Sequence, residues 1–186
     1  MIHKKPYKTL KIMPEILALL CLPVAAGLLI ALSVIDLREM ILPDELNLAL
    51  AVTGIAFHIL TGLALIDAGS MLAGALAGGG LLYGIRFIAN RYYGQDALGL
   101  GDVKLLAAAG LWLGPEGVLQ AITLGALAGL LHGFAYAGWL KYKTGAAPSI
   151  HRLSIPAGPG FAVGIFGAGT FMLAPWLRAT LPGLLS

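Results

Sequence analysis

Two aspartates at the edges of apolar segments are the residues best placed to carry chemistry. Asp36 ends the apolar run 28–35, and Asp102 follows Gly101 at the start of another apolar run. Carboxylates near lipid are costly, so each needs a structural or functional reason. A pair of carboxyl groups can divide acid–base work, because the ionised group activates a water molecule while the protonated group donates a proton. That chemistry requires a fold that brings both side chains to one place.

The composition indicates a membrane protein. Of the 186 residues, 59% are hydrophobic and only 11% are charged, whereas soluble domains usually carry about 25% charged residues. The apolar residues form segments of about 20, the length at which a helix crosses about 30 Å of hydrocarbon. The expected spans are 14–35, 46–66, 70–88, 103–114, 117–140 and 156–177. The sequence therefore predicts an all-α polytopic membrane protein, a bundle of about six transmembrane helices, and excludes a soluble catalytic domain.

A single transmembrane domain accounts for most of the chain. We expect this domain over 14–178, between a basic N-terminal tail over 1–13 and a C-terminal tail over 179–186. A signal peptide is the competing interpretation of residues 1–27, but the apolar run there is too long for a typical signal. The one cysteine, Cys21, leaves no possibility of an internal disulfide or a cysteine-rich zinc module.

Many of the 26 glycines are spaced for helix packing. Helices in lipid approach one another through small residues four positions apart. Such glycines are Gly74/Gly78, Gly110/Gly114, Gly125/Gly129/Gly133 and Gly160/Gly164. We expect most of them to lie where helices cross.

The basic residues predict the orientation in the membrane, because Lys and Arg concentrate in cytoplasmic connections. The first, third and fifth connections hold seven of the 12 basic residues, and the second and fourth hold none. The seven are Arg38, Arg86, Arg91, Lys104, Lys141, Lys143 and Arg152. This places the odd connections in the cytoplasm, although the N-terminal lysines alone would favour the opposite. Because two spans separate Asp36 from Asp102, both aspartates share one face in either orientation.

Several acids have simple structural explanations. Asp44 follows Pro43 and opens the second helix, where its side chain can cap free backbone amides. Asp102 has the same alternative, since aspartate is a good N-cap. Asp36 has none, because the macrodipole disfavours an anion at the C-terminal end of a helix. The acids interpreted as ordinary solvated loop residues are Glu39, Glu45, Asp67 and Glu116.

Two stretches resemble the signature motifs of the prepilin peptidase family, the GxGD-type membrane aspartic proteases. The stretch 35–44 has the pattern Asp, five residues, Leu-Pro. The stretch 96–106 has an acid six residues before the aspartate of a Gly-x-Gly-Asp and a lysine two residues after that aspartate. The segment 155–159 is also similar to the Pro-Gly-Pro segment that opens the last helix of the family. The resemblance extends from about residue 28 to about residue 167.

The resemblance implies an aspartic endopeptidase that removes the short basic leader of type IV pilin-like precursors on the cytoplasmic side of the inner (plasma) membrane. Its implied partners are a pilin or pseudopilin precursor, with a basic leader and a hydrophobic helix, and the lipid bilayer. No nucleic acid, cofactor or metal is expected, and the oligomeric state is unknown. Larger members also N-methylate the trimmed pilin and carry a module with paired CxxC motifs. This chain resembles the short form that lacks this module, so we expect no methyltransferase activity.

By resemblance, Asp36 and Asp102 are the catalytic pair. Because Asp102 lies at a helix N-terminus and Asp36 at a helix C-terminus, we expect Asp102 to be the base and Asp36 the acid in the resting enzyme. Gly99 and Gly101 either let the backbone approach an extended substrate or form a plain flexible loop. Lys104 either tunes Asp102 or, as we favour, extends to the lipid headgroups. The possible contacts to the basic leader are Asp96, Glu39 and Asp44.

Other chemistries are less well supported. A proton-coupled small transporter using the same two carboxylates is the main alternative, but transporters commonly place such groups near the middle of the membrane. A pilus-machine subunit without catalysis is a third possibility. His58 and His132 lie in separate apolar spans, and the chain has no HExxH or GxSxG motif, which disfavours a metalloprotease and a serine protease. We expect both histidines to be hydrogen-bonded in the interior.

Overall fold

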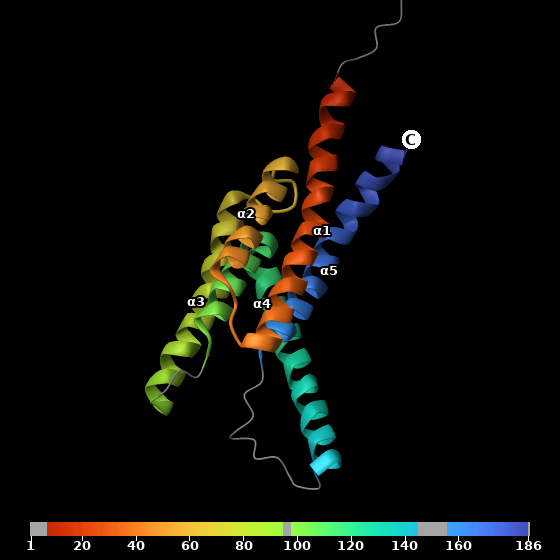
Figure 1. Cartoon of the computed structure of the whole chain (residues 1–186). Coiled ribbons are helices and arrows are strands. Elements are labelled where there is room, and N and C mark those ends of the chain that lie inside the picture. The colour runs from red at the N-terminus through yellow and green to blue at the C-terminus, as the bar shows by residue number, and fades with distance from the viewer. Residues whose placement is uncertain (1–6, 95–97, 145–155, 186) are drawn as a thin grey trace, which may run out of the picture.

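The computed structural model describes residues 7–94, 98–144 and 156–185, and the regular elements in these ranges are all α-helices. The helices are α1 (Tyr7–Glu39), α2 (Asp44–Leu60), α3 (Ala68–Tyr93), α4 (Leu100–Thr144) and α5 (Gly158–Leu185) (Figure 1). Four of them, all except α2, are long and apolar enough to cross a membrane. The all-helical membrane class is confirmed. The count of about six helices is not confirmed, because the described ranges contain five.

The difference in count arises inside α4. The expected spans 103–114 and 117–140 both lie within this helix, but Gly114 has the non-helical angles φ 68° and ψ −176° and is followed by Pro115. Leu106 and Val118 both lie within 3.0 Å of the position that a Cβ would take on Gly78. In a straight helix these two residues would be about 18 Å apart. The chain therefore folds back at Gly114 (Figure 1), and α4 consists of a first arm, 100–113, and a second arm, 115–144.

Glycines form the closest helix crossings, as their spacing predicts. A Cβ on Gly110 of the first arm would lie 2.1 Å from the carbonyl oxygen of Gly74 in α3. A Cβ on Gly164 of α5 would lie 2.1 Å from the carbonyl oxygen of Ala121 in the second arm. Both distances are too short for any residue with a side chain. Gly129 also lies at a crossing, because its backbone nitrogen and Cα would be 3.2 and 3.3 Å from a Cβ on Gly160 of α5, although a Cβ on Gly129 itself would meet nothing within 4 Å.

Gly110→Ala is therefore expected to destabilise the bundle by about 1–3 kcal/mol or more, the usual cost of overpacking. The atoms that an added Cβ would meet belong to the α3 backbone and cannot rotate away. The midpoint of thermal unfolding in detergent, followed by circular dichroism, should fall. Gly80→Ala is the matched control, because a Cβ there meets nothing within 4 Å. Equal midpoints for both variants would show that this crossing does not limit stability.

Buried hydrogen bonds fasten α2 to the first arm near its end. The indole Nε1 of Trp112 donates to the carbonyl oxygen of Leu50 at 2.8 Å, and Nε2 of His58 donates to the carbonyl oxygen of Trp112 at 2.9 Å. The break at Gly114 leaves the last carbonyls of the first arm without helical donors, so the His58 ring satisfies one of them. The predicted interior position of His58 is confirmed, whereas that of His132 is wrong, because His132 is exposed.

The helix cap predicted for Asp44 is wrong, and another aspartate caps a different helix. Pro43 is the N-cap of α2 and makes no side-chain cap, so Asp44 does not cap that helix. Asp67 caps α3 instead, accepting hydrogen bonds from the backbone nitrogen of Ser70 at 2.9 Å and from its hydroxyl at 3.1 Å. These hydrogen bonds hold the pKa of the Asp67 carboxyl below its usual range. Asp67 is therefore a capping residue and not simply a solvated loop acid.

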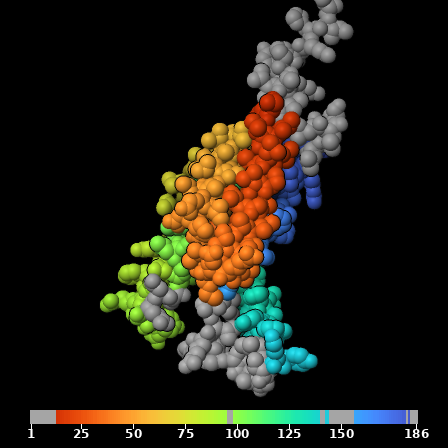
Figure 2. Space-filling view, in the orientation of Figure 1, coloured from red at the N-terminus to blue at the C-terminus, as the bar shows by residue number. Residues whose placement is uncertain are grey.

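The two ends of the bundle differ in which connections they hold. In Figure 1 the α1–α2 connection, the end of α3 and the start of α4 lie at the lower end, and the α2–α3 connection lies at the upper end with the start of α1 and the end of α5. The outer view shows α1 and α2 side by side on the near face (Figure 2). Parts of both expected tails are helical, since α1 begins at Tyr7 and α5 continues to Leu185. Asp36 and Asp102 share the lower end, as expected from the spans between them.

Candidate active site

Asp36 is buried in the last turn of α1 and is held by the start of α5. Its side chain is 6% exposed, and its Oδ2 accepts a 2.8 Å hydrogen bond from the backbone nitrogen of Gly158. Gly158 is the first residue of α5, where backbone N–H groups lack helical partners. A Cβ on Gly158 would lie only 2.7 Å from Oδ2 of Asp36. Asp36 therefore lies between the C-terminus of one helix and the N-terminus of another, and the dipole argument for its role as the acid loses its basis.

Asp102 is held in a similar way at the start of the first arm. It is 8% exposed and is the third residue of α4, so it is not the N-cap. The backbone N–H of Gly99 donates to its carboxylate, the arrangement by which an acid in the first turn reaches back toward the cap. A Cβ on Gly99 would lie 2.9 Å from Oδ2 of Asp102. The other oxygen, Oδ1, is buried without a hydrogen-bond partner in the part of the chain that the structure describes.

The structure brings the two aspartates together. Asp36 interacts electrostatically with Asp102, although they are 66 positions apart in the chain. Each carboxylate accepts a hydrogen bond from the backbone of a glycine that has no room for a side chain. Two carboxyl groups that interact electrostatically do not ionise independently, so one can retain a proton while the other is an anion. This is the arrangement that acid–base catalysis by a carboxyl pair requires.

Lys104 and Asp44 form an ion pair that the sequence did not predict. The Nζ of Lys104 lies 2.7 Å from Oδ1 and 2.6 Å from Oδ2 of Asp44, and it joins the start of α4 to the start of α2. Lys104 therefore has a protein partner, and its extension to the lipid headgroups stays a prediction. The side chains are 42% and 67% exposed, so the pair contributes little to stability.

The remaining predicted site residues take other places. Gly99 is exposed and lies against Asp102, whereas a Cβ on Gly101 would lie 2.8 Å from the Cβ of Leu42, so Gly101 serves tight packing inside the protein. Glu39 is exposed at the end of α1, and Asp96 lies outside the described residues. Gly158 contacts Asp36, but the sequence did not identify it as a site residue. The only signal for it was the similarity of 155–159 to the family's Pro-Gly-Pro segment.

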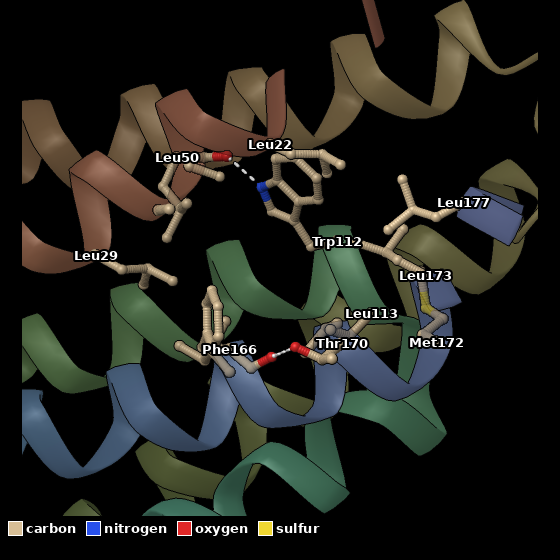
Figure 3. A pocket seen from close by; sticks show the side chains of 14 residues that line it. Leu22, Leu29, Leu50, Trp112, Leu113, Phe166, Thr170, Met172, Leu173 and Leu177 are labelled. Carbon is tan, nitrogen blue, oxygen red and sulfur yellow. Dashed lines mark hydrogen bonds between the residues drawn. The ribbon is translucent and has the colours of Figure 1, made fainter. Parts of the chain in front are cut away.

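An apolar cavity of about 210 Å³ lies deeper in the bundle and takes no part in this site. Figure 3 shows Leu22 and Leu29 of α1 on one side and Phe166 of α5 on another. The hydroxyl of Thr170 donates to the carbonyl oxygen of Phe166 at 2.7 Å, so this polar group is satisfied within α5. The cavity lining includes neither aspartate and offers no side chain for acid–base chemistry.

The matched part of the chain decides its family. The model of the type IV leader peptidase family matches residues 23–134, which include Asp36 and Asp102. The chain belongs to the type IV leader peptidase family. The match begins in α1 and ends in the second arm, so the leader peptidase signature covers both aspartates, whereas Gly158 lies beyond it.

Curated relatives bear the name prepilin leader peptidase/N-methyltransferase. The relative from Pectobacterium carotovorum subsp. carotovorum is 38% identical over 141 residues, 75% of this chain and 47% of the relative. That from Dickeya chrysanthemi is 34% identical over 164 residues, 86% of this chain and 52% of the relative. This leader peptidase family member thus spans about half the length of the curated relatives it matches, and the methyltransferase in their names is said of them alone. No solved structure matches the chain.

Proposed function

We propose that this chain is a membrane aspartic endopeptidase that removes the leader of pilin-like precursors, with Asp36 and Asp102 activating a water molecule. One observation carries the proposal: two buried aspartates from the ends of different helices interact in a member of the leader peptidase family. The same residues supply both halves of the chemistry, a proton acceptor and a proton donor.

The geometry supports Asp102 as the base. Its Oδ1 has no partner among the described residues, which leaves a lone pair for a water molecule, whereas Oδ2 of Asp36 is occupied by the Gly158 amide. In this mechanism Asp102 takes a proton from water, and the oxygen of that water attacks the scissile carbonyl carbon. Asp36 gives its proton to the leaving amine, and the C–N bond breaks. The proton taken by Asp102 then returns to Asp36 through solvent, which restores both groups. No covalent enzyme intermediate forms, because the attacking atom is the oxygen of water.

The proposed site faces the cytoplasm. The end of the bundle that holds both aspartates also holds Arg38, Arg86 and Arg91, as expected of a cytoplasmic end. The α2–α3 connection at the opposite end has no basic residue. A precursor whose basic leader lies in the cytoplasm and whose hydrophobic helix lies in the membrane presents the bond between them at this depth. The proposed location is the inner membrane.

Co-expression with a pilin precursor tests the proposal. The wild type should convert the precursor to a shorter product whose new N-terminus, read by mass spectrometry, begins at the hydrophobic segment. The double variant Asp36→Asn/Asp102→Asn should leave the precursor intact. Asp67→Asn is the matched control, because it changes an acid at the opposite end and asparagine still caps a helix. An intact precursor with the wild type, or proton-linked solute flux in vesicles without cleavage, would contradict the proposal and favour the transporter.

A further inference from the structure

A second hollow lies beside the proposed site, between α2, α3 and the first arm. It has a volume of about 470 Å³, and we call it the α2–α4 groove. Its mouth is formed by Asp44, Glu45 and Lys104, and its deeper walls include Ala51, Ala75 and Ala107. Lys104 is only two residues from Asp102, so the mouth lies at the same turn of α4 as the proposed site. The mouth is therefore at the level of the proposed site, and from there the groove extends along α2 and the first arm.

Asn47 is the group in this groove that the fold leaves unexplained. Its side chain is 4% exposed, and neither Nδ2 nor Oδ1 has a hydrogen-bond partner within the described ranges. Buried amides are nearly always hydrogen-bonded, because an unpaired one loses its contacts with water and gains nothing. A carboxamide holds a donor and an acceptor side by side, which matches the C=O and N–H of a peptide backbone. The unpaired amide indicates a peptide ligand.

The shape and charge of the groove indicate which part of a peptide it holds. Three small alanine side chains on three helices let another segment approach closely at membrane depth. At the mouth Lys104 is paired with Asp44, so Glu45 leaves the mouth with one net negative charge. A segment that is apolar in the groove and basic beyond the mouth would be complementary to both ends. The proposed precursor has this arrangement, with a basic leader followed by a hydrophobic segment.

We infer that the α2–α4 groove holds the hydrophobic segment of the precursor that follows the cleaved bond, with its backbone hydrogen-bonded to Asn47. The inference rests on the proposed function and adds the place at which the substrate enters. Beyond the mouth the precursor crosses the N-terminal end of α4, where Gly99 is exposed. That path brings the bond before the hydrophobic segment to Asp36 and Asp102.

Photo-crosslinking tests the location. A benzoylphenylalanine in place of Leu48, which lines the groove and is 66% exposed, should crosslink to the precursor. The same probe in place of Ile30, which is 65% exposed on α1, is the matched control and should not. Both probes are placed in the Asp36→Asn/Asp102→Asn variant so that the precursor stays intact. Equal crosslinking from the two positions, or adducts with lipid alone at Leu48, would overturn the inference.

Kinetics test the role of Asn47. Asn47→Leu should raise KM about tenfold and leave kcat nearly unchanged, because it removes a contact made equally in the ground and transition states. Leucine also removes the unpaired buried amide, so a loss of folding does not explain a raised KM. Thr53→Val is the matched control, since that hydroxyl donates to the carbonyl oxygen of Ala49 within α2. If the wild type cleaves the precursor and Asn47→Leu has an unchanged KM, the inference about the groove is overturned and the proposed function stands. If the wild type does not cleave the precursor, the proposed function is overturned.

Discussion

Asp102→Asn and Asp36→Asn are each expected to slow cleavage of the precursor by about 10²- to 10⁴-fold, the usual contribution of a general acid or base. Asparagine has nearly the size of aspartate, so the buried contacts with Gly99 and Gly158 can be kept. Asparagine cannot take a proton from water or give one to the leaving amine. The precursor should still bind, because neither substitution changes the α2–α4 groove.

The double variant gives the sharper result. Residues that act as one unit have strongly non-additive effects, so Asp36→Asn/Asp102→Asn should be about as slow as the slower single variant. Single-turnover rates in detergent or proteoliposomes measure all three variants against the wild type. If the double variant showed the product of the two single effects, the aspartates would act independently. Wild-type rates in either single variant would remove that residue from the mechanism.

The shared position of the two aspartates could be predicted because it depends on the apolar runs alone. Two apolar segments, which fold as α2 and α3, lie between Asp36 and Asp102 and return the chain to the same end of the bundle, whatever the packing of the helices. The glycine crossings were also predictable, since the spacing at Gly74 and Gly110 reflects a local helical period. The break between the expected spans 103–114 and 117–140 was predictable too, but their joining into one element was not, because α4 passes through Gly114 without an intervening loop.

The contacts around the aspartates could not be predicted from local rules. A capping rule considers only residues near a helix start, so it predicted that Asp44 caps the helix that it opens. The observed partner of Asp44 is Lys104, which is 60 positions away in the chain. Gly158 is 122 positions from Asp36 and has no charge or side chain to suggest a role. What makes Gly158 part of the site is the lack of a Cβ at the point where α5 meets the Asp36 carboxylate. Only the arrangement of the helices in space shows this.

Gly158→Ala is therefore expected to reduce cleavage by about 10²-fold, the loss that a misplacement of about 1 Å can cause at a reacting group. An added Cβ would lie 2.7 Å from Oδ2, 3.0 Å from Cγ and 3.1 Å from Cβ of Asp36. Either the carboxylate or the first turn of α5 must move, and the 2.8 Å hydrogen bond to the Gly158 nitrogen is lengthened. Since that hydrogen bond fixes the orientation of Asp36, the loss should appear in kcat more than in KM. Rates at saturating and at limiting precursor separate the two constants.

Gly169→Ala is the matched control in the same helix, because a Cβ there would lie 3.7 Å from Leu113 at an ordinary contact distance. This variant should cleave at the wild-type rate. Thermal unfolding of both variants distinguishes a displaced carboxylate from a destabilised bundle, since the three atoms nearest to the added methyl of Gly158→Ala all belong to the Asp36 side chain. Full activity in a folded Gly158→Ala would show that α5 does not position Asp36. A loss of kcat at an unchanged unfolding midpoint would instead make the N-terminus of α5 the third element of the active site, beside the end of α1 and the start of α4.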